Sequence, residues 1–194
     1  MENPIIKTAE LRDADSILDA MTLSFSVDPI SRWMWPEPGT YLKAFPRLAK
    51  AFGFRGLEEG TAYMVEGPRA AAMWLKPGTE VDGDAIGALV EETIPEERLE
   101  EVGAFFGQVQ EFHPQIEHWY LPMIGADPAY IGQGLGAALM KHALSVCDDQ
   151  SLPAYLESSN PRNISLYERH GFEVMGTIQT ETSPVMTPMY RAAR

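Results

Sequence analysis

Residues Ile131 to Ala137 read Ile-Gly-Gln-Gly-Leu-Gly-Ala, and a periodic apolar segment from Ala138 to Val146 follows directly. Glycines at alternate positions leave the backbone N–H groups uncrowded by side chains. The helix that the periodic segment predicts adds four N–H groups without intrahelical partners and the positive end of the helix dipole. This combination predicts a phosphate-binding loop between a strand and a helix.

The bulk properties of the chain are those of one globular domain, which we expect to extend over residues 1–194. The net charge of −13 argues against a nucleic-acid surface, which needs a basic stripe. The same charge is compatible with a cationic acceptor or with solubility alone. The single cysteine, Cys147, excludes an internal disulfide and is expected to be buried in a helix. Neither a signal segment within Met1–Arg12 nor a membrane span is indicated, so we expect a cytoplasmic protein with no membrane partner.

The order of the apolar patterns predicts a single α/β domain. Expected helices cover Asp13–Phe25 with Asp13 as N-cap, a short segment from Asp28-Pro29, Tyr41–Phe54, Val81–Phe112 with a break at Pro95, a helix ending near Asp148, and Pro161–His170. Expected strands cover Ile5–Ala9, Thr61–Val65, Ala70–Leu75, Ile116–Ala126, Ala154–Glu157, Phe172–Thr180 and Val185–Arg191, with a hairpin turn at Glu66-Gly67-Pro68-Arg69.

The glycine loop also satisfies the dinucleotide-binding pattern G-x-G-x-x-A, with Glu157 about 20 residues downstream. Two features disfavour that interpretation. Only 37 residues follow Glu157, too few for the rest of a doubly wound sheet. The segment Asp127–Tyr130 also separates the glycines from the strand. A purely structural use of the glycines, in close helix packing, stays open.

A second motif lies between Ser158 and Phe172. Asn160-Pro161 predicts a helix start and Gly171 a helix end. Asn163 and Tyr167 are four residues apart, so both project from one helix face. A side-chain amide can hydrogen-bond an amide-rich ligand, and a neutral phenol can protonate a departing thiolate. The alternative is an ordinary core tyrosine beside a solvated asparagine.

Together these motifs resemble the GNAT N-acetyltransferase superfamily, whose members transfer an acetyl group from acetyl-CoA to an amine. The family's cofactor motif, Arg/Gln-x-x-Gly-x-Gly/Ala, corresponds to Ile131–Gly136, with Ile131 departing at the first position. Asn163, Tyr167 and Gly171-Phe172 look like the family's later segment. The stretch Tyr155–Asn163 with Leu166–Arg169 resembles the puromycin N-acetyltransferase branch, and the convincing similarity covers Trp119–Gly176.

The resemblance implies a mixed, mostly antiparallel central sheet with splayed fourth and fifth strands, flanked by helices. Residues 116–180 would then bind acetyl-CoA, while the N-terminal half would bind the acceptor. The resemblance also implies which residues bind the cofactor through backbone or side-chain groups. They are Ile124, Gly125, Ala126, Ile131, Gly132, Gln133, Gly134, Leu135, Gly136, Ala137, Asn163 and Tyr167. The expected catalytic groups are the Ile124 N–H, for the oxyanion, and Tyr167, for the thiolate. No metal is expected. Pro122 cannot donate within its strand, which is therefore not regularly paired on both sides.

The expected function is acetyl transfer from acetyl-CoA to a primary amine of a small molecule. A non-catalytic acyl-CoA sensor and a protein N-terminal or lysine acetyltransferase remain alternatives. A deep pocket lined by Trp33, Trp35, Trp74 and Tyr120 would favour the small acceptor. The base is left open among Glu117, His118, Glu157 and solvent, and a homodimer is also left open. The remaining histidines, His113, His142 and His170, are expected to be surface or packing residues.

Overall fold

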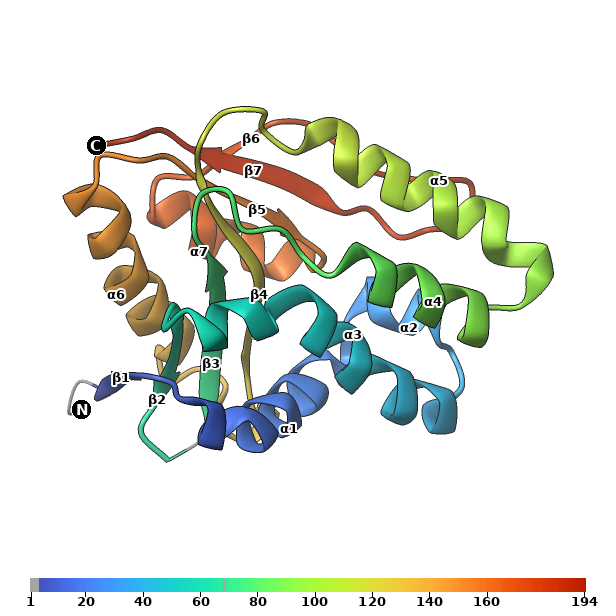
Figure 1. Ribbon diagram of the computed structural model, residues 1–194, viewed down its shortest axis with the longest axis horizontal. Helices are drawn as coiled ribbons and strands as arrows, with labels where there is room; N and C mark the ends of the chain where they lie inside the picture. The colour runs from blue at the N-terminus through green and yellow to red at the C-terminus, as the bar shows by residue number, and fades with distance from the viewer. Residues whose placement is uncertain (1–3, 68) are drawn as a thin grey trace.

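The computed structural model describes residues 4–67 and 69–194. Its centre is a seven-stranded sheet in the order β1-β2-β3-β4-β5-β7-β6 (Figure 1). Only the β4–β5 pair is parallel, and every other neighbouring pair is antiparallel. The strands are β1 (Ile6–Thr8), β2 (Ala62–Val65), β3 (Ala70–Leu75), β4 (Trp119–Ala126), β5 (Ala154–Ser158), β6 (Glu173–Val174) and β7 (Thr187–Arg191). This mixed sheet is the one expected, and it excludes the doubly wound parallel sheet of the dinucleotide alternative.

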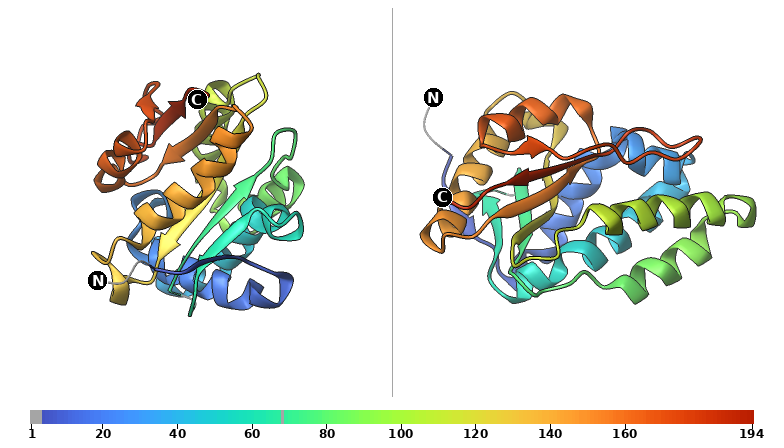
Figure 2. Two further views of the ribbon diagram at one scale, coloured as in Figure 1. Left: turned by 90° about the vertical axis from the view of Figure 1, so that its left-hand side faces the viewer. Right: turned by 90° about the horizontal axis from the view of Figure 1, so that it is seen from above.

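Helices cover both faces of the sheet (Figures 1 and 2). On one face lie α1 (Ala14–Ser24) and α3 (Pro38–Glu58), and on the other lies α6 (Leu135–Asp149). The remaining helices are α2 (Pro29–Met34), α4 (Gly83–Thr93), α5 (Glu96–Phe112) and α7 (Ile164–Arg169). Short 3-10 turns cover Leu11–Asp13, Phe25–Val27, Pro128–Tyr130 and Pro161–Asn163. The expected break between two helices at Pro95 is confirmed.

The residues of strand β3 contribute to two hydrophobic cores, one on each face of the sheet. Successive strand residues face opposite sides of a sheet. Ala71 and Met73 accordingly pack with α1 and α3, whereas Ala72 and Trp74 pack with α6. All six β3 residues are buried, as expected for a central strand covered on both faces.

Helix α3 approaches β3 so closely that it needs glycine at the contact. A Cβ atom on Gly56 would lie 2.2 Å from the carbonyl oxygen of Trp74. Real Cβ atoms do not approach backbone this closely, so a side chain at this position would push the helix off the sheet. Gly53, one turn earlier, would in the same way overlap Met73.

Several expected boundaries were wrong. Strand β4 begins at Trp119 and not at Ile116, which is exposed. Helix α3 begins at Pro38 and ends at Glu58, beyond the expected Tyr41–Phe54. Asp13 does not cap α1 with its side chain, because its carboxylate accepts the N–H of Glu10 at 3.0 Å instead. The expected hairpin turn includes Pro68, which lies outside the described residues.

The expected strand over Phe172–Thr180 was also wrong. It is limited to β6 and one isolated bridge between Ile178 and Met186. The chain leaves the sheet after β6 to run alongside α5 (Figure 1), where the backbone of Gln179 bonds the side chain of Gln108 in both directions. Contact with α5 therefore replaces further pairing in the ladder.

Candidate active site

Strands β4 and β5 pair over only three residues each before they separate. The parallel register joins Trp119–Leu121 to Ala154–Leu156 and stops there. The next residue of β4 is Pro122, which has no N–H to donate to a ladder. On its other side, β4 pairs with β3 up to Ala126, with two β4 residues, Leu121 and Pro122, opposite the single residue Trp74. The expected splay of the fourth and fifth strands is therefore confirmed, and it begins at a bulge.

The register decides where the backbone of β4 directs its N–H groups. Asp127 N–H donates to Arg69 O at 2.8 Å, across the end of the β3–β4 ladder. In an antiparallel ladder this bond makes Ala126 and Ile124 members of non-hydrogen-bonded pairs. The N–H groups of both residues consequently face away from β3. That of Ala126 is taken by Ser24 Oγ at 3.2 Å, whereas that of Ile124 faces the gap beside β5.

Gly125 has a packing role as well. Its N–H lies on the β3 side by the same alternation, and a Cβ atom there would lie 2.6 Å from Ser24 Oγ. Helix α1 therefore crosses β4 directly over this residue. Its assignment to the cofactor stays a prediction.

The glycine loop has the geometry of an open cradle before α6. Gly132 and Gly134 have φ values of +83° and +75°, a left-handed conformation that favours glycine. Added Cβ atoms at either residue would meet no described atom within 4 Å. Gly134 is the N-cap of α6 and offers no side chain, so the first N–H groups of the helix are left for a ligand. The backbone present thus fits a pyrophosphate.

The other loop positions differ in their surroundings. Ile131 and Gln133 are exposed, whereas Leu135 is buried and anchors the helix in the core. Gly136 and Ala137 lie within α6, and Gly136 has no positive φ. Within this loop, the left-handed conformation is therefore adopted by Gly132 and Gly134.

The second motif folds as the sequence predicts. Asn160 caps a 3-10 turn by accepting the N–H of Arg162 at 3.1 Å, and α7 continues from it. Gly171 ends the helix with φ +89°. Asn163 and Tyr167 both line one pocket, as their spacing predicts. Burial, and next the charge of Asp28, raise the pKa of the Tyr167 hydroxyl above its ordinary value, so this phenol keeps its proton.

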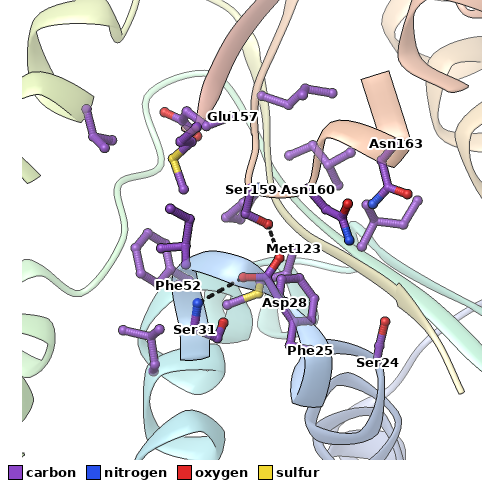
Figure 3. Close-up of a pocket in the computed structure, with 18 of the residues that line it drawn as sticks. Ser24, Phe25, Asp28, Ser31, Phe52, Met123, Glu157, Ser159, Asn160 and Asn163 are labelled. Atoms are coloured by element: carbon purple, nitrogen blue, oxygen red, sulfur yellow. Dashed lines mark hydrogen bonds between the residues drawn. The ribbon is translucent and has the colours of Figure 1, made fainter. Parts of the chain in front are cut away.

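Asp28 is a site residue that the sequence analysis missed. It caps α2 as expected, because its Oδ1 accepts the N–H of Ser31 at 2.9 Å. Its other oxygen accepts the hydroxyl of Ser159, just after β5, at 2.5 Å (Figure 3). The side chain is buried, and this burial raises the pKa of the carboxyl group. The Asp-Pro pair signalled a helix start, but a partner 131 residues away leaves no local signal.

Of the three candidate bases, only Glu157 lines the pocket. Its Oε2 accepts the Tyr120 hydroxyl at 2.8 Å. His113 Nδ1 lies 3.9 Å from the Glu157 Oε1 atom, and His113 in turn contacts His118, with 3.1 Å between the two Nε2 atoms. Burial lowers the pKa of His118. Glu117 is exposed. His113 also packs edge-on against Tyr120 and Tyr155, which agrees with the packing role expected for it.

The pocket connects the gap between β4 and β5 with a chamber under α2, α3 and α5 (Figure 3). Its empty space, with the opening to solvent included, is about 1010 Å³. Of the four aromatic residues whose presence in the pocket would favour a small acceptor, only Tyr120 is among the described lining residues. Trp35 and Trp74 are fully buried in the two cores. Trp33 instead donates to the Thr182 hydroxyl at 2.9 Å.

Other expectations concern residues outside the pocket. Cys147 is 1% exposed, and burial raises the pKa of its thiol to about 12, so its expected burial is confirmed. His142 packs edge-on against Tyr63, and His170 Nδ1 lies 2.8 Å from the carbonyl of Leu166. Among residues 4–67 and 69–194, no three His, Cys, Asp or Glu side chains gather as a metal site. None of the helices in the same ranges has the length and apolarity needed to cross a membrane.

The sequence and the fold of this chain are similar to those of known acetyltransferases. A curated relative, an uncharacterized N-acetyltransferase of Schizosaccharomyces pombe, is 39% identical over 54 residues, which is 28% of this chain and 22% of that protein's length. Among solved structures, a protein from Corynebacterium glutamicum described as a histone acetyltransferase and related acetyltransferase has a TM-score of 0.72 at 22% identity, covering 100% of this chain and 98% of that one. Arylalkylamine N-acetyltransferase 2 of Aedes aegypti has a TM-score of 0.66 at 11% identity, with 100% of both chains covered. The model of the acetyltransferase (GNAT) family matches residues 28–172. This chain therefore belongs to the GNAT acetyltransferase family.

Proposed function

We propose that this protein transfers the acetyl group of acetyl-CoA directly to a primary amine of a small molecule. The observation that carries the proposal is the gap at Pro122, where β4 and β5 separate next to Tyr167 and open into the pocket. The pyrophosphate of the cofactor would be bound by the N–H groups of Gly132–Gly136, and the amide of Asn163 would hydrogen-bond its pantetheine arm.

In the proposed reaction, the amine nitrogen attacks the thioester carbonyl carbon and the carbon–sulfur bond breaks. The Ile124 N–H, directed into the gap, donates to the oxyanion. The Tyr167 hydroxyl, which its raised pKa keeps protonated at ordinary pH values, donates its proton to the departing thiolate. The products are an N-substituted acetamide and coenzyme A.

Asp28 is the proposed base that takes the proton of the amine. Its raised pKa brings it closer to the operating pH, as general base catalysis requires. Asp28 and Tyr167 line the same pocket, so the proposed base and acid face the same space. The bonds from Ser31 and Ser159 fix the orientation of Asp28. Glu157, which also lines the pocket, is the alternative base.

Three further points support a small acceptor. The carboxyl groups of Asp28 and Glu157 are buried in the pocket, whereas a protein substrate would need an open groove. Similar folds include a mosquito protein described as an arylalkylamine N-acetyltransferase and a Drosophila melanogaster protein described as a polyamine N-acetyltransferase. The resemblance of Tyr155–Asn163 to the puromycin N-acetyltransferase branch points the same way.

A panel of amines with detection of released thiol tests the proposal. The panel contains monoamines, polyamines, amino sugars, amino acids and a lysine-containing peptide. Thiol release with one of the small amines, and the matching acetamide by mass spectrometry, is the expected result. Release with the peptide alone would favour a protein acetyltransferase. Binding of acetyl-CoA without release by any amine would favour the sensor alternative.

A further inference from the structure

The chamber that would receive the acceptor has apolar walls. Side chains from the 3-10 turn after α1, from α3 and α5, and from the segment before β7 form part of its surface, among them Phe25, Phe52, Phe105, Phe106, Val109 and Met186. Burying apolar surface against such a wall contributes roughly 25 cal/mol per Å². An amine without an apolar body would forgo this contribution and would leave the walls exposed to water.

The charged groups of the chamber are acidic. Asp28 and Glu157 line it, and among the described lining residues there is no lysine, arginine or histidine. A carboxylate or phosphate on the acceptor would meet two acidic side chains with no cation to pair with it. The chamber therefore selects against amino acids and phosphorylated amines and favours a cation.

The side chain of Glu157 has an oxygen atom that lacks a hydrogen-bond donor in the described part of the chain. Its side chain is 5% exposed. One oxygen accepts the Tyr120 hydroxyl, but Oε1 is buried and has no hydrogen-bond partner among the described residues. The nearest basic group, His113 Nδ1, is 3.9 Å away, beyond hydrogen-bond distance. Buried acceptors of this kind are almost always paired. The Tyr155 hydroxyl, which is also buried without a partner among the described residues and feels the charge of Glu157, is one donor that could pair with Oε1, and a ligand that enters the pocket is the other.

We infer that the acceptor is a primary amine with an apolar, ring-sized body, without an acidic group, and with a second N–H or O–H donor that reaches Glu157. The inference rests on the proposed function. In it the two acids have separate tasks. Asp28, next to Tyr167, takes the reacting amine, and Glu157 recognises the far end of the same molecule.

The experiment compares 2-phenylethylamine with its three ring-hydroxylated isomers, which place the second donor at different positions. Phenylalanine adds an acidic group, and 1,4-diaminobutane removes the apolar body. We expect kcat/KM of the best isomer to exceed that of the parent by about tenfold or more, because a hydrogen bond to a charged group contributes about 1.5–3 kcal/mol. Phenylalanine and diaminobutane should be at least tenfold poorer than the parent.

The Glu157→Gln variant keeps the side-chain volume and removes the charge. It should reduce the preference for the hydroxylated isomer to about twofold, with the loss mainly in KM. Glu117→Gln, an exposed glutamate outside the pocket, is the matched control and should keep the wild-type ratio. The ratio measured on the wild-type enzyme remains decisive if Glu157→Gln fails to fold.

Equal kcat/KM for the parent and all three isomers would overturn the inference, as would a preference for phenylalanine or diaminobutane. Calorimetric titration of the same amines into the coenzyme A-bound protein separates this result from failure of the proposed function. Binding that favours a hydroxylated isomer and depends on Glu157, without thiol release by any amine, would support the inference and refute the acetyltransferase proposal. Turnover of other amines, with no binding of the phenylethylamines, would support the acetyltransferase proposal and refute the inference about the acceptor.

Discussion

Replacing Tyr167 by phenylalanine tests the proposed proton donor while leaving the fold almost undisturbed. The residue is 5% exposed, and its ring packs against Phe172 with 6.3 Å between centroids. Phenylalanine keeps these contacts. Tyr41 and Tyr120 use their hydroxyls in internal hydrogen bonds, but that of Tyr167 has no such partner among the described residues. We therefore expect the free energy of unfolding to change by less than about 0.5 kcal/mol.

The effect on turnover should be much larger. General acid catalysis contributes about 10²–10⁴-fold. A simple thiol has a pKa of about 8.5, so a thiolate is a tolerable leaving group and the low end applies. We expect about a 100-fold loss, which corresponds to about 2.7 kcal/mol of barrier. The loss should fall on kcat and kcat/KM alike, because the proton is delivered only in the transition state.

Steady-state thiol release with the best amine of the panel measures this effect. Tyr63→Phe is the matched control, since Tyr63 is also buried, at 6% exposed, in the same core as Tyr167 but outside the pocket. It should keep the wild-type kcat within about twofold. Undiminished kcat in Tyr167→Phe, with wild-type stability, would refute the proton-donor role and leave Tyr167 as a packing residue.

Three further predictions address the cradle, the packing and the base. Acetyl-CoA at about 100 times its Kd should stabilise the protein by about 2.7 kcal/mol, measured as a rise in Tm. Gly134→Val should abolish this rise. Gly78→Val is the control, because Gly78 has a similar φ of +80° but lies outside the cradle, and this variant should keep the rise. In urea unfolding, Gly56→Ala should lower the free energy of unfolding by about 1–3 kcal/mol, because its Cβ would overlap the backbone of Trp74. Gly103→Ala, in open space on α5, should raise it by up to about 1 kcal/mol. Equal effects of the two substitutions would refute the close-packing argument. The pKa of Asp28 is raised in the folded state, so its contribution to stability is present below the unfolded value of 3.8 and is lost as pH rises through the folded pKa. Asp28→Asn should therefore be at least as stable as the wild type at pH 7, yet lose 10²-fold or more in kcat/KM together with the acidic limb of the pH profile; a retained limb would assign the base elsewhere.

The sequence by itself determined the features whose causes are local. The helix start after the glycine loop, the Asn160 cap and the shared face of Asn163 and Tyr167 follow from residues within a few positions of one another. Capping, glycine conformation and helical spacing act over one or two turns, so they can be predicted without knowledge of the rest of the chain. The burial of Cys147 follows from the same periodicity.

The tertiary structure alone decided which distant groups meet at the site. Asp28 and Ser159 come from the two halves of the chain, and the direction of the Ile124 N–H depends on the register of β4 against β3. A one-residue shift in that register would turn this N–H back into the sheet, and no local pattern sets the register. Trp35 and Trp74 fill the cores because helices cover both faces of the sheet, so aromatic composition could not identify the lining of the pocket. The chemistry of the pocket acids is likewise set by burial, which depends on the packing of all the surrounding elements.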